Sequence, residues 1–273
     1  MSVGEENPMG EFLRARRAQL RPADVGIAPT KRRRVPGLRR EEAARLAGIS
    51  SEYYLRLEQG RDQNPSDSVL AGLARALLLD DSATAYLFAL ARPHATAQST
   101  TRESESVSIG LRQLLQAWDG TPAYVQGRTL DVLASNELAR RLAPVFTPGV
   151  NLVRAAFLDP QVKELWRDWS RMTAATVAGL RAQTSAERDD PRLAELVSSL
   201  SAESPEFARL WARHEVRPKG EGRSVIDHPL VGELDLRYEK LAVAAPATGQ
   251  VVVIYHADPG SPTRDRLERL RSA

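Results

Sequence analysis

The sequence predicts an α+β protein with two domains: a helical N-terminal domain, and a C-terminal domain in which helices cover an antiparallel sheet. Five segments with helix-like spacing of apolar residues occupy the first third of the 273-residue chain. A polar stretch without apolar periodicity, PHATAQSTTRESES, follows them. The remainder has strand-like runs near both ends and helical segments between them. We therefore predict a helical domain at 9–92, a linker at 93–106 and the second domain at 107–273.

The helical domain begins with a helix expected at Gly10–Leu20, which a loop rich in Pro and Gly separates from two short helices within residues 40–60. The fourth helix is expected at Ser66–Leu79, where the Ser66 hydroxyl can cap the first turn. The fifth is expected at Ser82–Ala91. All five show the 3.6-residue spacing of an amphipathic helix.

Residues 40–60, REEAARLAGISSEYYLRLEQG, have the pattern of a helix-turn-helix. Small residues stand where a second helix would cross the first: Ala43, Ala44 and Ala47. Gly48 tolerates the left-handed backbone that such a turn needs. Ile49 supplies an apolar plug, and Ser50 is a good cap for the second helix.

The second of these helices has an inward and an outward side. Tyr54 and Leu57 are three residues apart and are expected to face inward. The residues left on the outside, beside the cap Ser50, are Ser51, Glu52, Tyr53 and Arg56. In a major groove these side chains would face the base edges. The alternative is a plain helical hairpin with no DNA contact.

Positive charge is concentrated before this motif. Residues 9–92 hold 15 Lys and Arg against 10 Asp and Glu, whereas residues 93–273 hold 23 of each. The loop that precedes the motif contributes Lys31, Arg32, Arg33, Arg34, Arg39 and Arg40. Close-packed like charges repel one another unless an anion is near, and DNA phosphates are the anions expected here. The alternative is a solvated, flexible loop.

Residues 10–91 resemble the xenobiotic-response-element (XRE) type of helix-turn-helix, which is shared with phage repressors such as the lambda repressor. The resemblance rests on FLRARR, REEAARLAGISSEYYLRLEQG and LAGLARALLL. It implies five helices with a recognition helix at about 51–59, and it places Arg40, like the outward residues of that helix, against DNA. It also implies an ion pair between Glu58 and an arginine of the first helix, for which Arg17 is the candidate. The chain departs from the family by having Leu38 and Arg39 where Ser or Thr often caps the second helix, and by its long basic loop.

The second domain mixes strands and helices. PAYVQGRTLDVLASN is expected to form a hairpin that turns at Gly127 and Arg128. Three later strands are expected in GRSVIDHP, GELDLRYEKLAVAA and QVVVIYHA. The expected helices are 107–118, 136–142, 151–158, 160–183, 190–201, 205–214 and 263–271.

The basic motif followed by RLWARHEV, HPLVGELDLRYEKLAV and VVVIYHADPGSP resembles the MmyB-type regulators, over nearly the whole chain. That resemblance implies a PAS-like second domain, in which an antiparallel sheet and helices enclose an apolar cavity. It also implies a small apolar ligand, such as a fatty acid, and a dimeric transcriptional regulator.

A candidate ligand pocket can be named within the second domain. Apolar residues follow one stripe of the segment 160–183, and alternate residues of the strand 232–245 face one side. The candidate lining residues are Leu165, Trp169, Met172, Thr176, Trp211, His214, Leu236 and Tyr238. His214 could bind a carboxylate or hydroxyl, because apolar pockets contain few placed polar groups. The alternatives are that the stripe is ordinary core and that His214 is a satisfied structural residue.

Several classes of function are disfavoured. The chain has no cysteine, which excludes disulfides, thiol catalysis and Cys-ligated zinc, and its four histidines are scattered. No catalytic or nucleotide-binding motif is present, so we expect neither an enzyme nor a cofactor or metal. No apolar run is long enough to cross a membrane, and a cytoplasmic protein is expected.

The sequence therefore predicts a sequence-specific DNA-binding transcriptional regulator. Its expected partners are a palindromic DNA operator, a small apolar ligand that could be a fatty acid, and a second copy of the chain. The competing hypothesis is that the second domain binds no small molecule and serves as a protein-interaction or dimerisation module.

Overall fold

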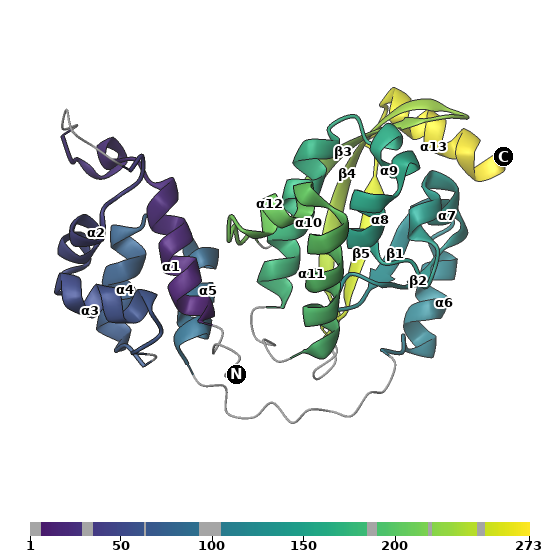
Figure 1. Cartoon of the computed structure of the whole chain (residues 1–273). Helices are drawn as coiled ribbons and strands as arrows, with labels where there is room; N and C mark the ends of the chain where they lie inside the picture. Colours follow the sequence, from purple (N-terminus) through teal and green to yellow (C-terminus); the bar gives the residue numbers. More distant parts are fainter. Residues whose placement is uncertain are drawn as a thin grey trace. The chain divides into compact units, whose positions relative to one another are not determined.

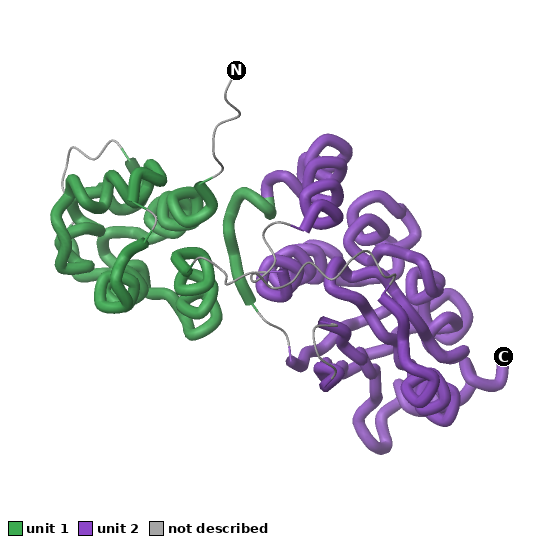
Figure 2. The backbone as a smooth tube through the Cα atoms, turned by 90° about the horizontal axis from the view of Figure 1, so that it is seen from below, with its two compact units in different colours: residues 1–97, 210–217 green, residues 98–209, 218–273 purple. Residues whose placement is uncertain are grey.

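A computed structural model describes residues 7–28, 35–62, 64–92, 105–184, 190–217, 220–244 and 249–273. The chain forms two compact units (Figure 2). One holds residues 1–97 and 210–217, and the other holds 98–209 and 218–273. A helical unit and a unit with an antiparallel sheet confirm the predicted α+β fold class.

The helical unit contains the five expected helices and one short 3-10 helix (Figure 1). They are α1 (Pro8–Gln19), η1 (Pro22–Val25), α2 (Arg40–Ala47), α3 (Ser51–Glu58), α4 (Asp67–Ala76) and α5 (Asp81–Ala91). Ser50, Ser66 and Asp80 cap α3, α4 and α5 by accepting a backbone N–H bond with their side chains. The apolar sides of the helices bury Phe12, Leu13, Leu38, Tyr54, Leu57, Leu73 and Leu87.

The second unit is organised around a five-stranded antiparallel sheet with the order β2-β1-β5-β4-β3. The strands are β1 (Ala123–Gln126), β2 (Val132–Ser135), β3 (Glu221–His228), β4 (Gly232–Ala242) and β5 (Val251–His256). The β1–β2 hairpin and the three later strands were expected from the sequence, and β3 and β4 form a second hairpin. Strand β5 lies between the two hairpins, so the sheet brings together strands from the beginning and from the end of the domain's sequence.

Nine further elements complete this unit (Figure 1). They are α6 (Ile109–Ala117), α7 (Glu137–Leu142), η2 (Pro144–Phe146), α8 (Leu152–Leu158), α9 (Pro160–Leu165), α10 (Trp169–Gln183), α11 (Pro191–Glu203), α12 (Pro205–Trp211) and α13 (Pro262–Ser272). The last two residues of α12 are grouped with the helical unit.

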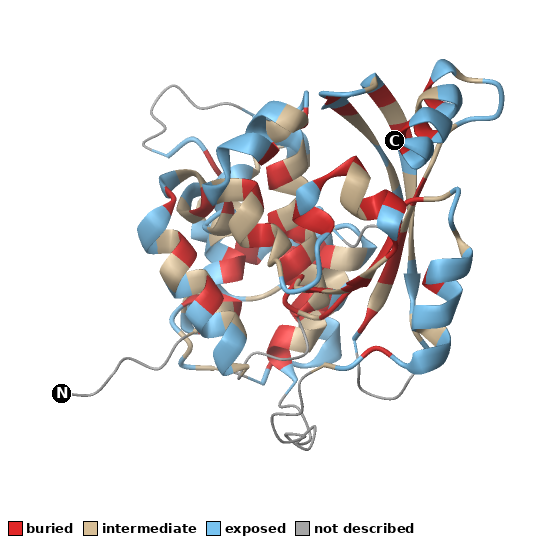
Figure 3. Cartoon of the chain, turned by 90° about the vertical axis from the view of Figure 1, so that its right-hand side faces the viewer, coloured by how far each residue is buried: buried red, intermediate tan, exposed pale blue. Residues whose placement is uncertain are grey.

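The sheet has an inner and an outer face, and both carry buried residues (Figure 3). The inner face holds Tyr124, Leu236, Tyr238, Val253 and Tyr255, which pack with residues of α7 to α10 and α13 in one apolar cluster. The outer face packs with α6 in a second, smaller cluster of Leu115, Ala123, Val125, Ala134 and Val252. Helices therefore contact both sides of the sheet.

The predicted helix 160–183 is wrong as a single element, because the chain breaks between α9 and α10. Trp166 forms an isolated β-bridge with Ile226 of β3, and the Arg167 N–H donates to the Val225 carbonyl at 3.2 Å. The Arg167 N–H is therefore bonded to β3, whereas in a continuous helix it would bond to the carbonyl four residues earlier. Asp168 then caps the new helix by accepting from the Arg171 N–H at 3.1 Å.

The predicted helix 205–214 is also too long. Helix α12 ends at Trp211, and the next turn is closed by a bond from the His214 N–H to the Trp211 carbonyl at 3.2 Å. His214 has a φ of 50°. A residue in this left-handed region ends an α-helix.

Candidate DNA-binding surface and inner face of the sheet

The turn between α2 and α3 has the predicted helix-turn-helix geometry. Gly48 adopts a φ of 74°, which ends α2. The Ile49 N–H then bonds back to the Ala44 carbonyl at 3.0 Å. Ser50 Oγ accepts from the Tyr53 N–H at 3.1 Å and starts α3. The predicted roles of Gly48 as helix terminator and Ser50 as cap are both confirmed.

Helix α3 has one buried and one exposed side, as its spacing predicts. Tyr54 and Leu57 are completely buried. Ser50, Ser51, Glu52 and Arg56 are exposed, and Tyr53 is half-buried. Gln59, the C-cap residue, is also exposed but was not predicted. Its place three residues after Arg56 and seven after Glu52 is the i, i+4, i+7 spacing of one helix face, which the sequence already contained.

Arg56 is held in place by neighbours on its own helix. Its guanidinium lies 3.8 Å from the Glu52 carboxylate and 5.2 Å from the centre of the Tyr53 ring. An exposed ion pair of this kind is weak, so Arg56 can exchange Glu52 for another acceptor at little cost. A guanidinium is also the commonest group to bond with a guanine edge in the major groove.

A buried carboxylate connects α3 to α1 and α2. Glu58 is 0% exposed, and its two oxygens accept from Arg17 Nε at 2.7 Å and from Arg40 Nε at 2.6 Å. Arg17 also donates to the Leu38 carbonyl at 2.7 Å, just before α2. The predicted pair of Glu58 with Arg17 is therefore confirmed, and the arrangement fixes the base of the recognition helix.

The two arginines at the start of α2, Arg39 and Arg40, have structural roles that the DNA prediction did not include. Arg40 bonds to Glu58, although its side chain is still 51% exposed. The Arg39 N–H donates to Glu42 Oε2 at 2.6 Å, so Glu42 takes over the capping that Ser or Thr would otherwise supply to α2. The remaining basic residues of the loop, Lys31, Arg32, Arg33 and Arg34, lie outside the described residues.

Four of the predicted pocket residues meet at the inner face of the sheet. Leu236 is completely buried there, and Leu165, Met172 and Tyr238 are half-buried against the same cluster. The Tyr238 ring leans over Gly222 of β3, where a Cβ atom would collide with it. Half-buried apolar side chains within a core cluster are the kind of surface that a small apolar molecule can cover.

Trp169 and Thr176 point to other parts of the same region. The Trp169 Nε1–H donates to the Ala156 carbonyl of α8 at 2.8 Å, and its ring packs edge-on against Phe157. Thr176 Oγ1 donates to the Met172 carbonyl at 2.9 Å, one turn earlier in α10. Both polar groups are satisfied within the protein.

Trp211 and His214 do not fall in the second unit. Both belong to the segment 210–217, which is grouped with the helical unit. Their assignment to the pocket stays a prediction.

A charged side chain on the inner face, Lys240, was not among the predicted site residues. Residues of β4 alternate between faces, and Leu234, Leu236 and Tyr238 pack into the inner cluster. Lys240 is the next residue in this series, so the spacing of the strand already indicated its side. Its side chain is half-buried, and burial lowers the pKa of Lys240 to about 8.

Three tyrosines share the inner face of the sheet with this lysine: Tyr124, Tyr238 and Tyr255. The rings of Tyr238 and Tyr255 are 5.7 Å apart. Burial raises the pKa of Tyr124 and of Tyr255 well above the ordinary value, so both stay neutral. A neutral hydroxyl can donate a hydrogen bond to an acid group.

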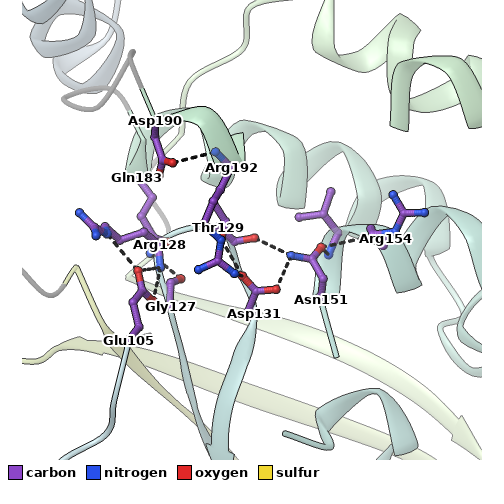
Figure 4. Close-up of polar contacts among 11 residues, drawn as sticks. Glu105, Gly127, Arg128, Thr129, Asp131, Asn151, Arg154, Gln183, Asp190 and Arg192 are labelled. Atoms are coloured by element: carbon purple, nitrogen blue, oxygen red, sulfur yellow. Dashed lines mark hydrogen bonds and ion pairs between the residues drawn. The ribbon is translucent and has the colours of Figure 1, made fainter. Parts of the chain in front are cut away.

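A polar network ties the β1–β2 turn to three helices (Figure 4). Asp131 accepts from Asn151 Nδ2 at 3.0 Å, before α8, and lies 3.7 Å from Arg192 of α11. Gln183, at the end of α10, donates to the Gly127 carbonyl at 3.1 Å. These contacts hold the helices that face the inner side of the sheet.

The same turn contacts the end of the predicted linker. Glu105 accepts from Arg128 Nε at 3.0 Å and from the Arg128 backbone N–H (Figure 4). Gln250 Nε2 donates to the Ser106 carbonyl at 3.1 Å. The chain that enters the second unit is therefore bonded to the turn that Gln183 also contacts.

Two other kinds of site were sought. Within the described ranges, no group of three or more His, Asp or Glu residues is placed to hold a metal ion. The described helices include none long and apolar enough to cross a membrane.

Comparison with known families assigns both parts of the chain. The model of a family described as the MmyB-like transcription regulator ligand binding domain matches residues 107–270. A model described as a helix-turn-helix domain matches residues 8–87. No curated protein matches the chain.

Proposed function

The chain belongs to the family of transcription regulators with an MmyB-like ligand binding domain, and from this premise we propose how its two parts act. Helix α3 enters the major groove of a specific operator, and the basic loop before α2 binds backbone phosphates. The second domain binds a small apolar molecule, such as a fatty acid, at the inner face of its sheet. Residues 9–92, 93–106 and 107–273 serve as DNA-binding domain, linker and ligand-binding domain.

The exposed side of α3 carries the DNA part of this proposal. Ser51, Glu52 and Arg56 project from a helix whose opposite side is completely buried, so they are free to meet base edges. The charge surplus of residues 9–92 supplies attraction to phosphates. Base contacts give specificity, whereas phosphate contacts give affinity for any sequence.

We expect Arg56→Ala and Arg33→Ala to affect DNA binding differently. Loss of a base contact in Arg56→Ala should weaken operator binding by roughly 10- to 100-fold and binding to random DNA far less. Loss of a phosphate contact in Arg33→Ala should weaken both and reduce the salt slope by about one unit. Fluorescence anisotropy on operator and random duplexes, over a range of salt concentrations, measures both effects. Identical profiles for the two variants would show that this division of roles is wrong.

Dimerisation is the second part of the proposal. Helix-turn-helix proteins that bind as dimers recognise two half-sites about one helical turn apart, so we propose a homodimer and a palindromic operator. A ligand changes binding when it favours one dimer geometry over another. The contacts of Glu105 with Arg128, and of Gln183 with Gly127, offer a route from α10 to the linker.

The ligand itself can be tested by native mass spectrometry of the purified full-length protein, before and after organic extraction. We expect an excess mass equal to one apolar molecule per subunit, removed by extraction. The half-buried inner face supports this expectation, because Leu165, Met172 and Tyr238 are left partly uncovered within a core cluster. A protein that shows its bare mass after purification in detergent-free buffer, and that gains none on incubation with fatty acids, contradicts it.

One observation favours the alternative of a pure interaction module. On α6, Ile109 is 76% exposed and Leu114 is 44% exposed, although Leu115 of the same helix is buried against the sheet. Exposed apolar side chains of this kind mark protein contacts. The same mass spectra decide this question: a dimer without bound ligand supports the interaction module.

A further inference from the structure

Lys240 is the one charged side chain on the inner face of the five described strands. In the register of the sheet it pairs with Val253, and Val253 pairs with Tyr124, so the three form a row across β4, β5 and β1. Val253 and Tyr124 both belong to the inner cluster. The lysine side chain therefore starts on the face of the sheet that carries the inner cluster.

Among the five described strands, the acidic side chains lie off this face. The acidic residues of the strands are Glu221, Asp227, Glu233, Asp235 and Glu239, and the register places all of them on the outer side. The two strand arginines are also outside, where Arg223 pairs with Asp235 and Arg237 pairs with Asp258. Helix α10, which packs Met172 against the inner cluster, contains no acidic residue.

The Lys240 ammonium has no partner among the described residues. The backbone N–H of Lys240 bonds to the Gly220 carbonyl at 2.6 Å, but no hydrogen bond or ion pair is formed by its Nζ within the described ranges. Partial burial of an ammonium without a counter-charge is unfavourable, and proteins normally pair such a group or replace it. Its lowered pKa of about 8 reflects this burial, yet leaves it mostly protonated at neutral pH.

We propose that Lys240 Nζ binds the acid group of the ligand, so that the second domain selects amphipathic acids over neutral apolar molecules of the same length. This inference rests on the proposed function, because it names the head group of the same ligand. The carboxylate would supply the missing counter-charge through a charge-assisted hydrogen bond from Lys240 Nζ. The apolar chain would cover Met172 and the other half-buried residues.

Affinities of the full-length, delipidated protein for dodecanoic acid and dodecan-1-ol test this proposal by isothermal titration calorimetry. A charge-assisted hydrogen bond should make wild type bind the acid roughly 10- to 100-fold more tightly than the alcohol. In Lys240→Met this preference should disappear through loss of affinity for the acid, with alcohol affinity nearly unchanged. Lys240→Arg should keep the preference. The matched control Arg237→Met removes a positive charge from the outer side of the same strand and should bind both probes like wild type.

The outcomes distinguish a failure of the role proposed for Lys240 from a failure of the proposed apolar ligand. If wild type binds acid and alcohol equally, or if Lys240→Met keeps the preference, the role of Lys240 is overturned while the apolar ligand stands. If neither probe binds wild type, the proposed apolar ligand is wrong, and the inference about Lys240 fails with it.

Stability of the ligand-free protein gives an independent readout. Since Lys240→Met replaces a half-buried cation, which has no partner among the described residues, by an apolar side chain, we expect its melting temperature to rise by roughly 3–8 °C. A lysine that merely supports the fold would give a fall instead. A lower melting temperature in Lys240→Met would therefore overturn the proposal even if acid binding were lost.

Discussion

Replacing Glu58 by alanine is expected to lower the free energy of unfolding of the helical unit by about 3–5 kcal/mol. Glu58 is completely buried and is the shared acceptor of Arg17 and Arg40. Its removal leaves the Arg17 guanidinium, which is only 12% exposed, without its counter-charge. Arg40 is half-exposed and can turn to solvent, so most of the cost comes from Arg17.

Hydrogen exchange in the full-length protein measures this loss, through amides of the described residues 7–28 and 35–62. If opening of the unit controls exchange, a loss of 3–5 kcal/mol raises exchange rates by roughly two to four orders of magnitude. Glu52→Ala is the matched control, because it removes an exposed acid from the same helix and should change stability by less than about 0.5 kcal/mol. Equal protection in Glu58→Ala and Glu52→Ala would refute the structural role of Glu58.

Loss of the Glu58 contacts should also weaken DNA binding. Arg17 bonds to both Glu58 and the Leu38 carbonyl, so the pair sets where the basic loop joins α2. Glu58→Gln keeps an acceptor for one arginine but not the charge, and we expect intermediate stability. Operator affinity should follow the same order: wild type, Glu58→Gln and then Glu58→Ala.

Asn136→Ala is expected to destabilise the second unit by about 3 kcal/mol or more, because one buried side chain satisfies four backbone groups. Asn136 Oδ1 accepts from Ala123 N–H at 3.1 Å and from Ala139 N–H at 2.9 Å. Its Nδ2 donates to the carbonyls of Trp118 and Thr121, each at 2.7 Å. The side chain thus joins the end of α6, the start of β1 and the first turn of α7. Alanine would leave the buried N–H groups of Ala123 and Ala139 without this acceptor and would remove one donor from each of the part-buried Trp118 and Thr121 carbonyls.

Tryptophan fluorescence during urea unfolding measures this effect, since three of the four tryptophans (118, 166 and 169) lie in the second unit. Ser108→Ala is the matched control. Ser108 is an exposed cap that accepts one bond, from the Leu111 N–H at 3.3 Å, and its loss should cost about 1 kcal/mol or less. If Asn136→Ala and Ser108→Ala unfold at the same urea concentration, the predicted contribution of the four Asn136 hydrogen bonds to stability is wrong.

Local chemistry explains why much of the fold could be predicted. The turn between α2 and α3 depends on Gly48 and Ser50, whose conformations are set by their own side chains and nearest neighbours. The inward positions of Tyr54 and Leu57 follow from the helical period. Strand β4 was recognisable because its residues alternate between apolar and charged.

The sequence by itself therefore determined the two-domain α+β layout, the helix-turn-helix and the facing of the strands, because each depends on interactions within a few residues. The break at Trp166 depends on pairing with β3, about 60 residues further along the chain. The engagement of Arg40 by Glu58 depends on how α2 and α3 pack. Whether the Lys240 ammonium meets a partner among the described residues depends on what other strands and helices bring to the inner face. Only the tertiary structure decided these three features, because the energy of a buried backbone group or charge is set by partners that are distant in sequence.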